Sequence, residues 1–199
     1  PDTAPTNSPI VTAYRQKTPG SEALWRRAQD SFPSGLTHDS RYLEPYGIYI
    51  DRADGPRKWD VDGNEYVDYF GGHGALILGH NHPVVAAAVQ AAYAKGTHFG
   101  ASHALEVEWA EQIRRMVPSA EKVRFTSSGT EATLMAVRLA RAYTKRAKIL
   151  RFRTHFHGWN DHMAPGQANH FDGSATAGVL DAVAAGVVLV DPNDRTGVE

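Results

Sequence analysis

Strand-like and helix-like segments alternate along the second half of this chain, and this alternation limits the folds that it can adopt. Short runs rich in β-forming residues at 122–126, 148–153 and 187–190 are separated by helix-forming segments at 130–146 and 181–185. Such alternation is typical of a mainly parallel sheet, because parallel strands need a long crossover that is usually a helix. We therefore predict an α/β fold with helices on both faces of the sheet.

Two more helices are predicted just before this region. Residues 84–95 are rich in alanine, follow a proline at a first-turn position and precede Gly96, which suits the end of a helix. Residues 104–117 place their large apolar side chains on one face and are followed by Pro118.

The first seventy residues have a different character. Residues 1–20 contain four prolines and predict a loose arm, and a short helix is expected over 21–30 with Ser21 as its N-cap. After this helix, the β-forming runs 46–50, 57–61 and 65–69 are separated by turn residues and predict a small antiparallel meander. We place the domain boundary near Gly71, with an N-terminal segment over 1–70 and the first part of a large α/β domain over 71–199.

Charge and hydropathy exclude several classes of partner. The chain has 21 Lys and Arg against 22 Asp and Glu, so no net positive field attracts nucleic acid. The longest apolar stretch, 177–190, is interrupted by Asp181 and is shorter than the ~20 residues that span a bilayer. No secretory segment is visible at the start and cysteine is absent, so we expect a cytoplasmic protein. The chain starts with Pro1 in place of Met, and residues 195–199 complete no expected secondary-structure element. We therefore expect the sequence to be truncated at both ends.

The segment Phe125–Ala132 carries the clearest chemical signal. Hydroxyl residues and a glycine lead directly into the long helix, where free backbone amides and the helix dipole favour a phosphate group. Ser127, Ser128 and Thr130 supply further donors. An alternative from these residues alone is that Ser128 or Thr130 is an ordinary N-cap.

The loop that follows the next strand, 154–159, should lie beside the start of the long helix. In open α/β sheets, ligands bind outside the carboxyl ends of the strands. Phe156 in this loop suggests stacking against a flat aromatic cofactor, although an isolated phenylalanine is more often part of a core.

These motifs, taken together, resemble the class III aminotransferases among the fold type I enzymes that use pyridoxal 5′-phosphate. The resemblance is strongest to the glutamate-1-semialdehyde aminomutase group. It covers about residues 25–165 and rests on ordered segments: 32–36 leading to Arg41, 59–63, 66–69, 78–83, 127–132, 138–143 and 156–158.

The resemblance implies roles for particular residues. The Gly129 and Thr130 amides and the Ser128 hydroxyl would hold the cofactor phosphate. Phe156 would stack on the pyridine ring, and His157 would shape the loop beneath it.

The resemblance also implies a role in substrate binding for two further residues. Arg41 lies where the aminomutase-like relatives have an arginine that binds the substrate carboxylate, a task that a planar guanidinium suits. His73 stands between Gly72 and Gly74, where that group has a tryptophan, and so alters the wall of the implied substrate pocket. Arg153 and Trp159 replace the family's glutamate and second histidine, and these departures leave the substrate open.

The resemblance implies transfer of an amino group on a small carboxylate-bearing substrate, through aldimine and ketimine intermediates, in a homodimer with its active site at the subunit boundary. This chemistry needs a lysine and a carboxylate that protonates the cofactor ring. No lysine of the chain stands in a matching context, so we expect the catalytic lysine beyond residue 199 and interpret the chain as the N-terminal half of a longer protein.

Two other functions remain open from the sequence. His80, His82, His155 and His157, with Asp161 or His162, could bind a metal ion and make the protein a metal-dependent hydrolase. A non-catalytic module that only binds the cofactor is the other alternative.

Overall fold

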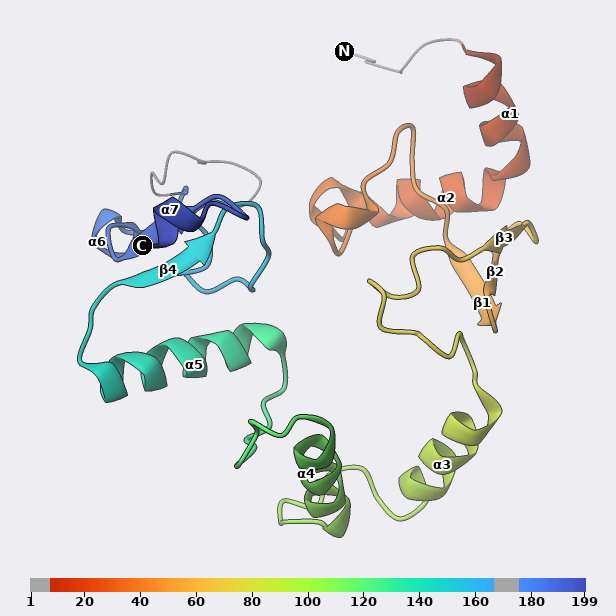
Figure 1. The fold of residues 1–199 in the computed structure, drawn as a ribbon. Coiled ribbons are helices and arrows are strands. Elements are labelled where there is room, and N and C mark those ends of the chain that lie inside the picture. The colour runs from red at the N-terminus through yellow and green to blue at the C-terminus, as the bar shows by residue number, and fades with distance from the viewer. Residues whose placement is uncertain (1–7, 167–175) are drawn as a thin grey trace. The chain divides into compact units, whose positions relative to one another are not determined.

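The computed structural model describes residues 8–166 and 176–199. The chain divides into two compact units, Pro1–Ala101 and Ser102–Glu199 (Figure 1). These units are defined by contacts within this chain and do not test the domain boundary expected near Gly71, which stays a prediction. No helix among the described residues is long and apolar enough to cross a lipid bilayer.

Helix α1 (Pro9–Lys17) forms where we expected a loose arm, whereas α2 (Pro19–Ala28) confirms the short helix expected over 21–30. The expectation of an arm was wrong for α1 and for the first turn of α2 because Pro9 and Pro19 occupy first-turn positions, where proline is tolerated and favours helix formation. Helix α1 is ordered against Tyr46: the Tyr14 hydroxyl donates to the Tyr46 carbonyl at 2.7 Å, and the two ring centroids lie 5.2 Å apart. Residues 1–7 of the expected arm lie outside the described residues.

Helix α2 begins earlier than expected, and a distant carboxylate holds its first turn. Thr18, rather than Ser21, is the N-cap residue. The Asp62 carboxylate accepts hydrogen bonds from the Gly20 amide at 2.6 Å and the Ser21 amide at 3.0 Å. Ser21 is fully buried, and its hydroxyl accepts from the Tyr49 amide. Because the capping group comes from 41 to 42 residues away, no local pattern marks this helix start.

The predicted antiparallel meander is confirmed. After the 3₁₀ turns η1 (Pro33–Gly35) and η2 (Asp39–Arg41), the chain forms β1 (Ile50–Asp54), β2 (Arg57–Asp60) and β3 (Glu65–Val67), in the order β1-β2-β3. The first strand begins at Ile50 rather than at Tyr46, because Tyr46 is buried against the two helices.

The two helices expected in the middle of the chain are also confirmed: α3 spans Pro83–Tyr93, and α4 spans Ala104–Met116. His103 caps α4, with its side chain accepting from the Leu105 amide while Glu106 bonds back to the His103 amide.

The second unit contains the long helix and a pair of parallel strands. Its remaining elements are α5 (Gly129–Thr144), β4 (Ile149–Phe152), α6 (Asp181–Ala184), β5 (Val187–Val190) and α7 (Arg195–Val198). Strands β4 and β5 pair in parallel over their whole length, as the helix–strand alternation predicted. The mainly parallel sheet with helices on both faces is represented among the described residues by this pair alone.

Residues 122–126 do not form the strand expected there. A run of β-forming residues becomes a strand only when a neighbouring strand supplies hydrogen bonds, and no strand of the described residues pairs with this run. Phe125 stacks instead on Trp109 of α4, with ring centroids 4.0 Å apart.

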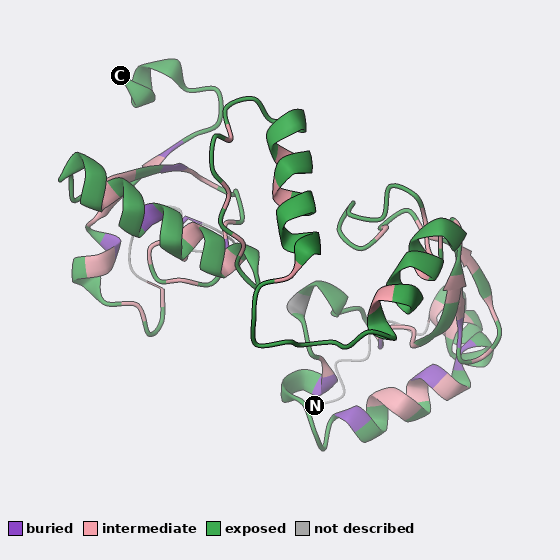
Figure 2. Ribbon diagram, turned by 90° about the horizontal axis from the view of Figure 1, so that it is seen from below, coloured by how far each residue is buried: buried purple, intermediate pink, exposed green. Residues whose placement is uncertain are grey.

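Much of the described chain is exposed (Figure 2), and the exposed residues include many with large apolar side chains. On α3, Val85, Val89 and Tyr93 lie on one face at i, i+4 and i+8 and are 49%, 60% and 71% exposed. Soluble monomeric proteins rarely leave contiguous apolar faces uncovered. The described residues therefore present helix faces suited to packing against additional protein.

Candidate functional site

The start of α5 presents hydrogen-bond donors at the end of a long helix. Ser128 is the N-cap, with an extended backbone, and its hydroxyl accepts from the Glu131 amide at 3.2 Å. The Gly129 and Thr130 amides have no partner inside the helix, as in any first turn. The structure thus shows the N-cap interpretation of Ser128, while two further amides remain directed at the mouth of the helix.

The space in front of this helix end is open to a ligand. Ser127, Ser128 and Gly129 are all exposed. A Cβ atom built on Gly129 would meet nothing within 4 Å, and its φ angle is not in the left-handed region. Glycine is therefore not required there by backbone conformation or by packing within this chain, and the open space above it is compatible with close approach of an anion.

The loop after β4 lies beside the start of α5, as predicted. The Thr133 hydroxyl donates to the His157 carbonyl at 2.8 Å, and the Asn160 side-chain amide donates to Thr133 Oγ1 at 3.1 Å. The Trp159 amide donates to Thr130 Oγ1 at 3.2 Å. Three hydrogen bonds from separate loop positions hold the loop against the first two turns of the helix.

Gly158 allows this close approach. Its φ angle is +104°, and a Cβ atom there would lie 2.6 Å from Thr130 Oγ1 and 2.8 Å from Thr130 Cα. An L side chain would both strain the backbone and collide with the helix. The spacing between loop and helix therefore depends on this glycine.

The two candidate cofactor residues of the loop differ in exposure. Phe156 is 60% exposed and contacts Trp159 edge-on, with ring centroids 5.8 Å apart, so it is not a core residue of this chain. His157 is half-buried. Burial, then the charge of Arg151, then His155 lower the pKa of the His157 imidazole. His157 is therefore neutral at neutral pH.

Arg151 is a structural residue of this site that sequence reasoning missed. It lies in the middle of β4, is 4% exposed, and donates to the backbone carbonyls of His155 and Met163. Burial lowers the pKa of its guanidinium. The sequence does contain a signal for this residue, an arginine inside a short β-forming run. A charged side chain is buried in such a strand only when hydrogen-bond partners surround it.

The two candidate substrate residues lie in the first unit, and each lies next to a residue that lines a hollow there. This hollow has a volume of about 620 Å³ and is lined by Phe32, Pro33, Ser34, Leu36, Thr37, His38 and Tyr42. Arg41 donates to Thr37 Oγ1 at 2.8 Å, and the His73 ring lies 5.8 Å from the His38 ring. Each candidate thus contacts a residue of the lining.

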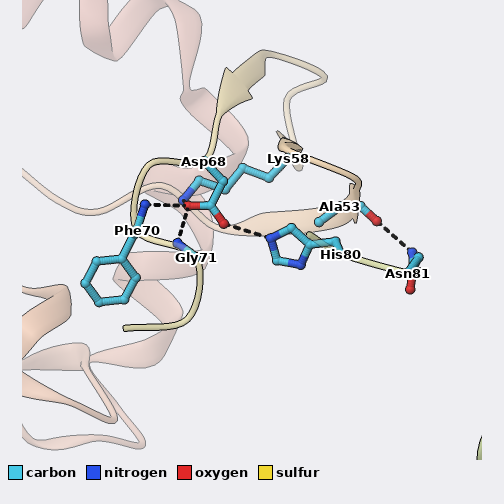
Figure 3. Close-up of polar contacts among 7 residues, drawn as sticks. All are labelled: Ala53, Lys58, Asp68, Phe70, Gly71, His80 and Asn81. Carbon is cyan, nitrogen blue, oxygen red and sulfur yellow. Dashed lines mark hydrogen bonds and ion pairs between the residues drawn. The ribbon is translucent and has the colours of Figure 1, made fainter. Parts of the chain in front are cut away.

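A polar cluster around Asp68 was not anticipated from the sequence (Figure 3). Its carboxylate accepts from Lys58 Nζ at 3.0 Å, from His80 Nε2 at 2.7 Å and from the amides of Phe70 and Gly71. The hydrogen bond from His80, followed by that from Lys58, holds the pKa of Asp68 well below its usual range. The acid and its partners are separated in sequence by 10 and 12 residues, so no local spacing identifies them.

The histidines proposed as metal ligands do not assemble among the described residues. His80 is bonded to Asp68, and the ring centroids of His155 and His157 lie 6.1 Å apart. In residues 8–166 and 176–199, no group of three or more His, Asp or Glu side chains could hold a metal ion.

Comparisons with known proteins give consistent matches. The family model for Aminotransferase class-III matches residues 39–170. A glutamate-1-semialdehyde 2,1-aminomutase from Sulfurisphaera tokodaii is 39% identical over 183 residues, which cover 90% of this chain and 44% of that protein.

Two solved structures share the fold. A transaminase with PLP bound is 40% identical, with a TM-score of 0.83, over 90% of this chain and 43% of that one. An omega-transaminase from Sphaerobacter thermophilus is 35% identical, with a TM-score of 0.85, over 94% of this chain and 44% of its own. The chain therefore spans less than half the length of the proteins that it matches.

Proposed function

Because the chain belongs to the class III aminotransferase family, we propose that the complete protein uses pyridoxal 5′-phosphate to move an amino group on a small carboxylate-bearing substrate. The catalysed reaction is either transfer between two molecules or isomerisation within one. The similarity to both an aminomutase and transaminases supports this pair of activities.

One observation carries the proposal: the loop after β4 is held against the N-terminus of α5 by the three hydrogen bonds from Thr133, Asn160 and Trp159. This contact puts an exposed aromatic ring on the loop that adjoins unpaired helix amides. A phosphorylated aromatic molecule needs both features together, an anion site and a flat apolar surface. The residues present therefore fit pyridoxal phosphate.

We assign the roles as follows. The amides of Gly129 and Thr130, with the Ser128 hydroxyl, bind the phosphate, and the positive end of the α5 dipole favours its charge. The Phe156 ring lies against the cofactor ring, and neutral His157 adds no competing charge beneath it. Bound at this position, the cofactor supplies an electron sink for the carbon that carries the amino group.

The catalytic lysine lies beyond residue 199 in this proposal, as does the carboxylate that protonates the cofactor ring. Support comes from the share of each relative that the chain covers, 43% to 44%. A non-catalytic binding module would lack that lysine in the complete protein.

The substrate end is formed by the hollow whose lining lies next to Arg41 and His73. The Arg41 guanidinium is exposed, is held at one nitrogen by Thr37 and can bind a carboxylate through its other donors. Substrates with the amino group at the β or ω carbon are as compatible with His73 as a semialdehyde.

We further propose that the complete protein is a cytoplasmic homodimer and that its active site lies at the subunit boundary. We also propose that β4 and β5 belong to a larger, mainly parallel sheet and that α5 is one of the helices that cover it. The exposed apolar face of α3 supports an assembly in which further protein covers it.

Cofactor binding by the complete protein tests the assignment. Replacing Gly129 with Val fills the open space above the helix end, so we expect the affinity for pyridoxal phosphate to fall by at least about tenfold, the equivalent of one lost charged contact. Absorbance of the bound cofactor in an equilibrium titration measures this. Ala140→Val is the matched control, since it introduces the same side chain at an exposed position near the far end of the same helix. Equal affinities for the two variants, or a wild-type protein that binds no cofactor, would refute the assignment.

A further inference from the structure

Residues 69–79 form a loop whose two ends are pinned at the same turn, between β1 and β2. At one end, the Asp68 amide donates to the Pro56 carbonyl at 2.8 Å. At the other end, His80 and Gly55 exchange two backbone hydrogen bonds of 2.8 and 2.9 Å. A loop with adjacent ends that packs on its own residues is an Ω-loop, a form that frequently carries function.

Side chains also hold the two ends of this loop together, at a place that we call its neck (Asp68, Gly79 and His80). Asp68 and His80 stand at its two ends, and the Asp68 carboxylate meets the His80 imidazole at 2.7 Å (Figure 3). Lys58 on β2 binds the same carboxylate at 3.0 Å. The Asp68 side chain is only 6% exposed, so water screens these contacts little.

The two ends of the loop approach so closely that the backbone leaves no room for a side chain at Gly79. A Cβ atom on Gly79 would lie 2.7 Å from the Gly55 carbonyl oxygen. The two chain segments therefore touch main chain to main chain, and the carboxylate contact is built on a fixed spacing.

The same carboxylate also holds the first turn of the loop. Its Oδ1 accepts from the Phe70 and Gly71 amides at 3.1 and 3.2 Å. Directly after them, residues 71–74 all have positive φ angles, between 49° and 82°. Three of these four are glycines, and the fourth is His73. A non-glycine residue keeps such a conformation only where its surroundings hold it.

His73 connects this loop to the hollow of the first unit. Its ring packs edge-on against Phe70 at 4.4 Å and lies 5.8 Å from His38, which lines the hollow. A short chain of contacts thus runs from Asp68 through the start of the loop to the hollow.

We propose that Asp68 is a positioning residue for substrate selection: with His80 and Lys58 it closes the neck of the 69–79 loop and so fixes where His73 stands beside the hollow. This inference rests on the proposed function for the role of the hollow. Asp68 itself touches no substrate. The group that selects among substrates is held by an ion pair and two amides at the base of its loop.

Hydrogen exchange in the complete protein tests the closure of the loop. In Asp68→Asn, we expect peptides covering 69–79 to exchange at least about tenfold faster, because losing charge-assisted hydrogen bonds favours local opening. Glu65→Gln is the matched control: Glu65 is a carboxylate on β3 whose pair with Arg57 is exposed. Unchanged exchange in Asp68→Asn, or equal changes in both variants, would overturn the proposal.

A second pair of variants covers the case in which Asp68→Asn does not fold. His80→Ala removes the donor to Asp68, whereas His80→Gln keeps an N–H donor on its side chain. We expect faster exchange over 69–79 in His80→Ala and substantial recovery in His80→Gln. Identical exchange in these two variants would contradict a role for the hydrogen bond.

Substrate selection is read from the cofactor absorbance on titration with β-phenylalanine and β-alanine. Asp68→Asn should change the ratio of the two apparent Kd values by about tenfold relative to wild type, with the affinity for pyridoxal phosphate unchanged. A ratio equal to that of wild type would refute the selective role. A wild-type protein that binds no cofactor would instead refute the proposed function, and the exchange measurement would still decide whether Asp68 closes the loop.

Discussion

Replacement of Gly158 by alanine probes the contact between the loop and α5 most directly. The added Cβ would lie 2.6 Å from Thr130 Oγ1, whereas ordinary contact begins near 3.4 Å, so the loop has to retreat by about 0.8 Å. The hydrogen bonds from Thr133 to the His157 carbonyl and from the Trp159 amide to Thr130 lie on either side of this point and lengthen with it.

Two contributions determine how much Gly158→Ala lowers the free energy of unfolding. Holding a non-glycine residue at φ +104° costs about 1–3 kcal/mol. The collision with Thr130 adds about 1–3 kcal/mol, as is typical for an extra methyl in a packed contact. We therefore expect Gly158→Ala to lower the free energy of unfolding by about 2–6 kcal/mol. We also expect the affinity for pyridoxal phosphate to fall as the loop moves away from the helix end.

Gly63→Ala separates these contributions. Gly63 has a φ angle of +84°, and a Cβ atom there would meet nothing within 4 Å, so this variant carries the backbone strain alone. Urea unfolding of the complete protein, followed by intrinsic fluorescence, measures the free energy, and an equilibrium titration measures the cofactor affinity. Equal losses of stability in the two variants, with cofactor affinity unchanged in both, would refute the packing argument.

Two further predictions concern charge. Arg41→Ala should raise KM for carboxylate substrates by about tenfold, because one charged contact is lost, while cofactor affinity stays unchanged. Steady-state assays measure this. A KM equal to that of wild type would show that Arg41 is only a surface charge. Burial alone would raise the pKa of Asp60, but hydrogen bonds from Asn64 and Tyr66 outweigh it and lower that pKa. Its stabilising contribution is therefore present above the unfolded value of about 3.9 and is lost as pH falls below it. Urea unfolding of wild type and Asp60→Asn should show a stability difference that shrinks from pH 6 to pH 3, and a constant difference would contradict it.

Local sequence signals were sufficient where neighbouring residues decide the structure. The long helix was expected over 130–146, with Ser128 or Thr130 as the alternative N-cap, and the structure has α5 from Gly129 with Ser128 as its cap. The position of the loop after β4 followed from a general property of α/β sheets, and Thr133 shows the contact. The cofactor and substrate roles of the site residues stay proposals.

Features set by distant residues were not predictable in this way. The N-terminus of α2 was misplaced because Asp62 holds its first turn from another part of the chain. Residues 122–126 were expected to form a strand on propensity, but a strand also needs a partner. The role of Asp68 was missed because its partners come from β2 and from the far end of a loop.

The candidate cofactor residues of the second unit and the candidate substrate residues of the first unit are positioned by the same physical principle. In each, a glycine lets two main-chain segments approach closely: Gly158 against Thr130 in one unit, and Gly79 against Gly55 in the other. In each, buried or half-buried polar groups then fix the spacing, while the side chain that we propose to meet a ligand stays accessible, as Phe156 does at 60% exposure. An exposed ring is not held in place by core packing, so its position has to be set by the backbone that carries it. Substitutions at these close contacts should therefore alter binding more strongly than their distance from the ligand suggests.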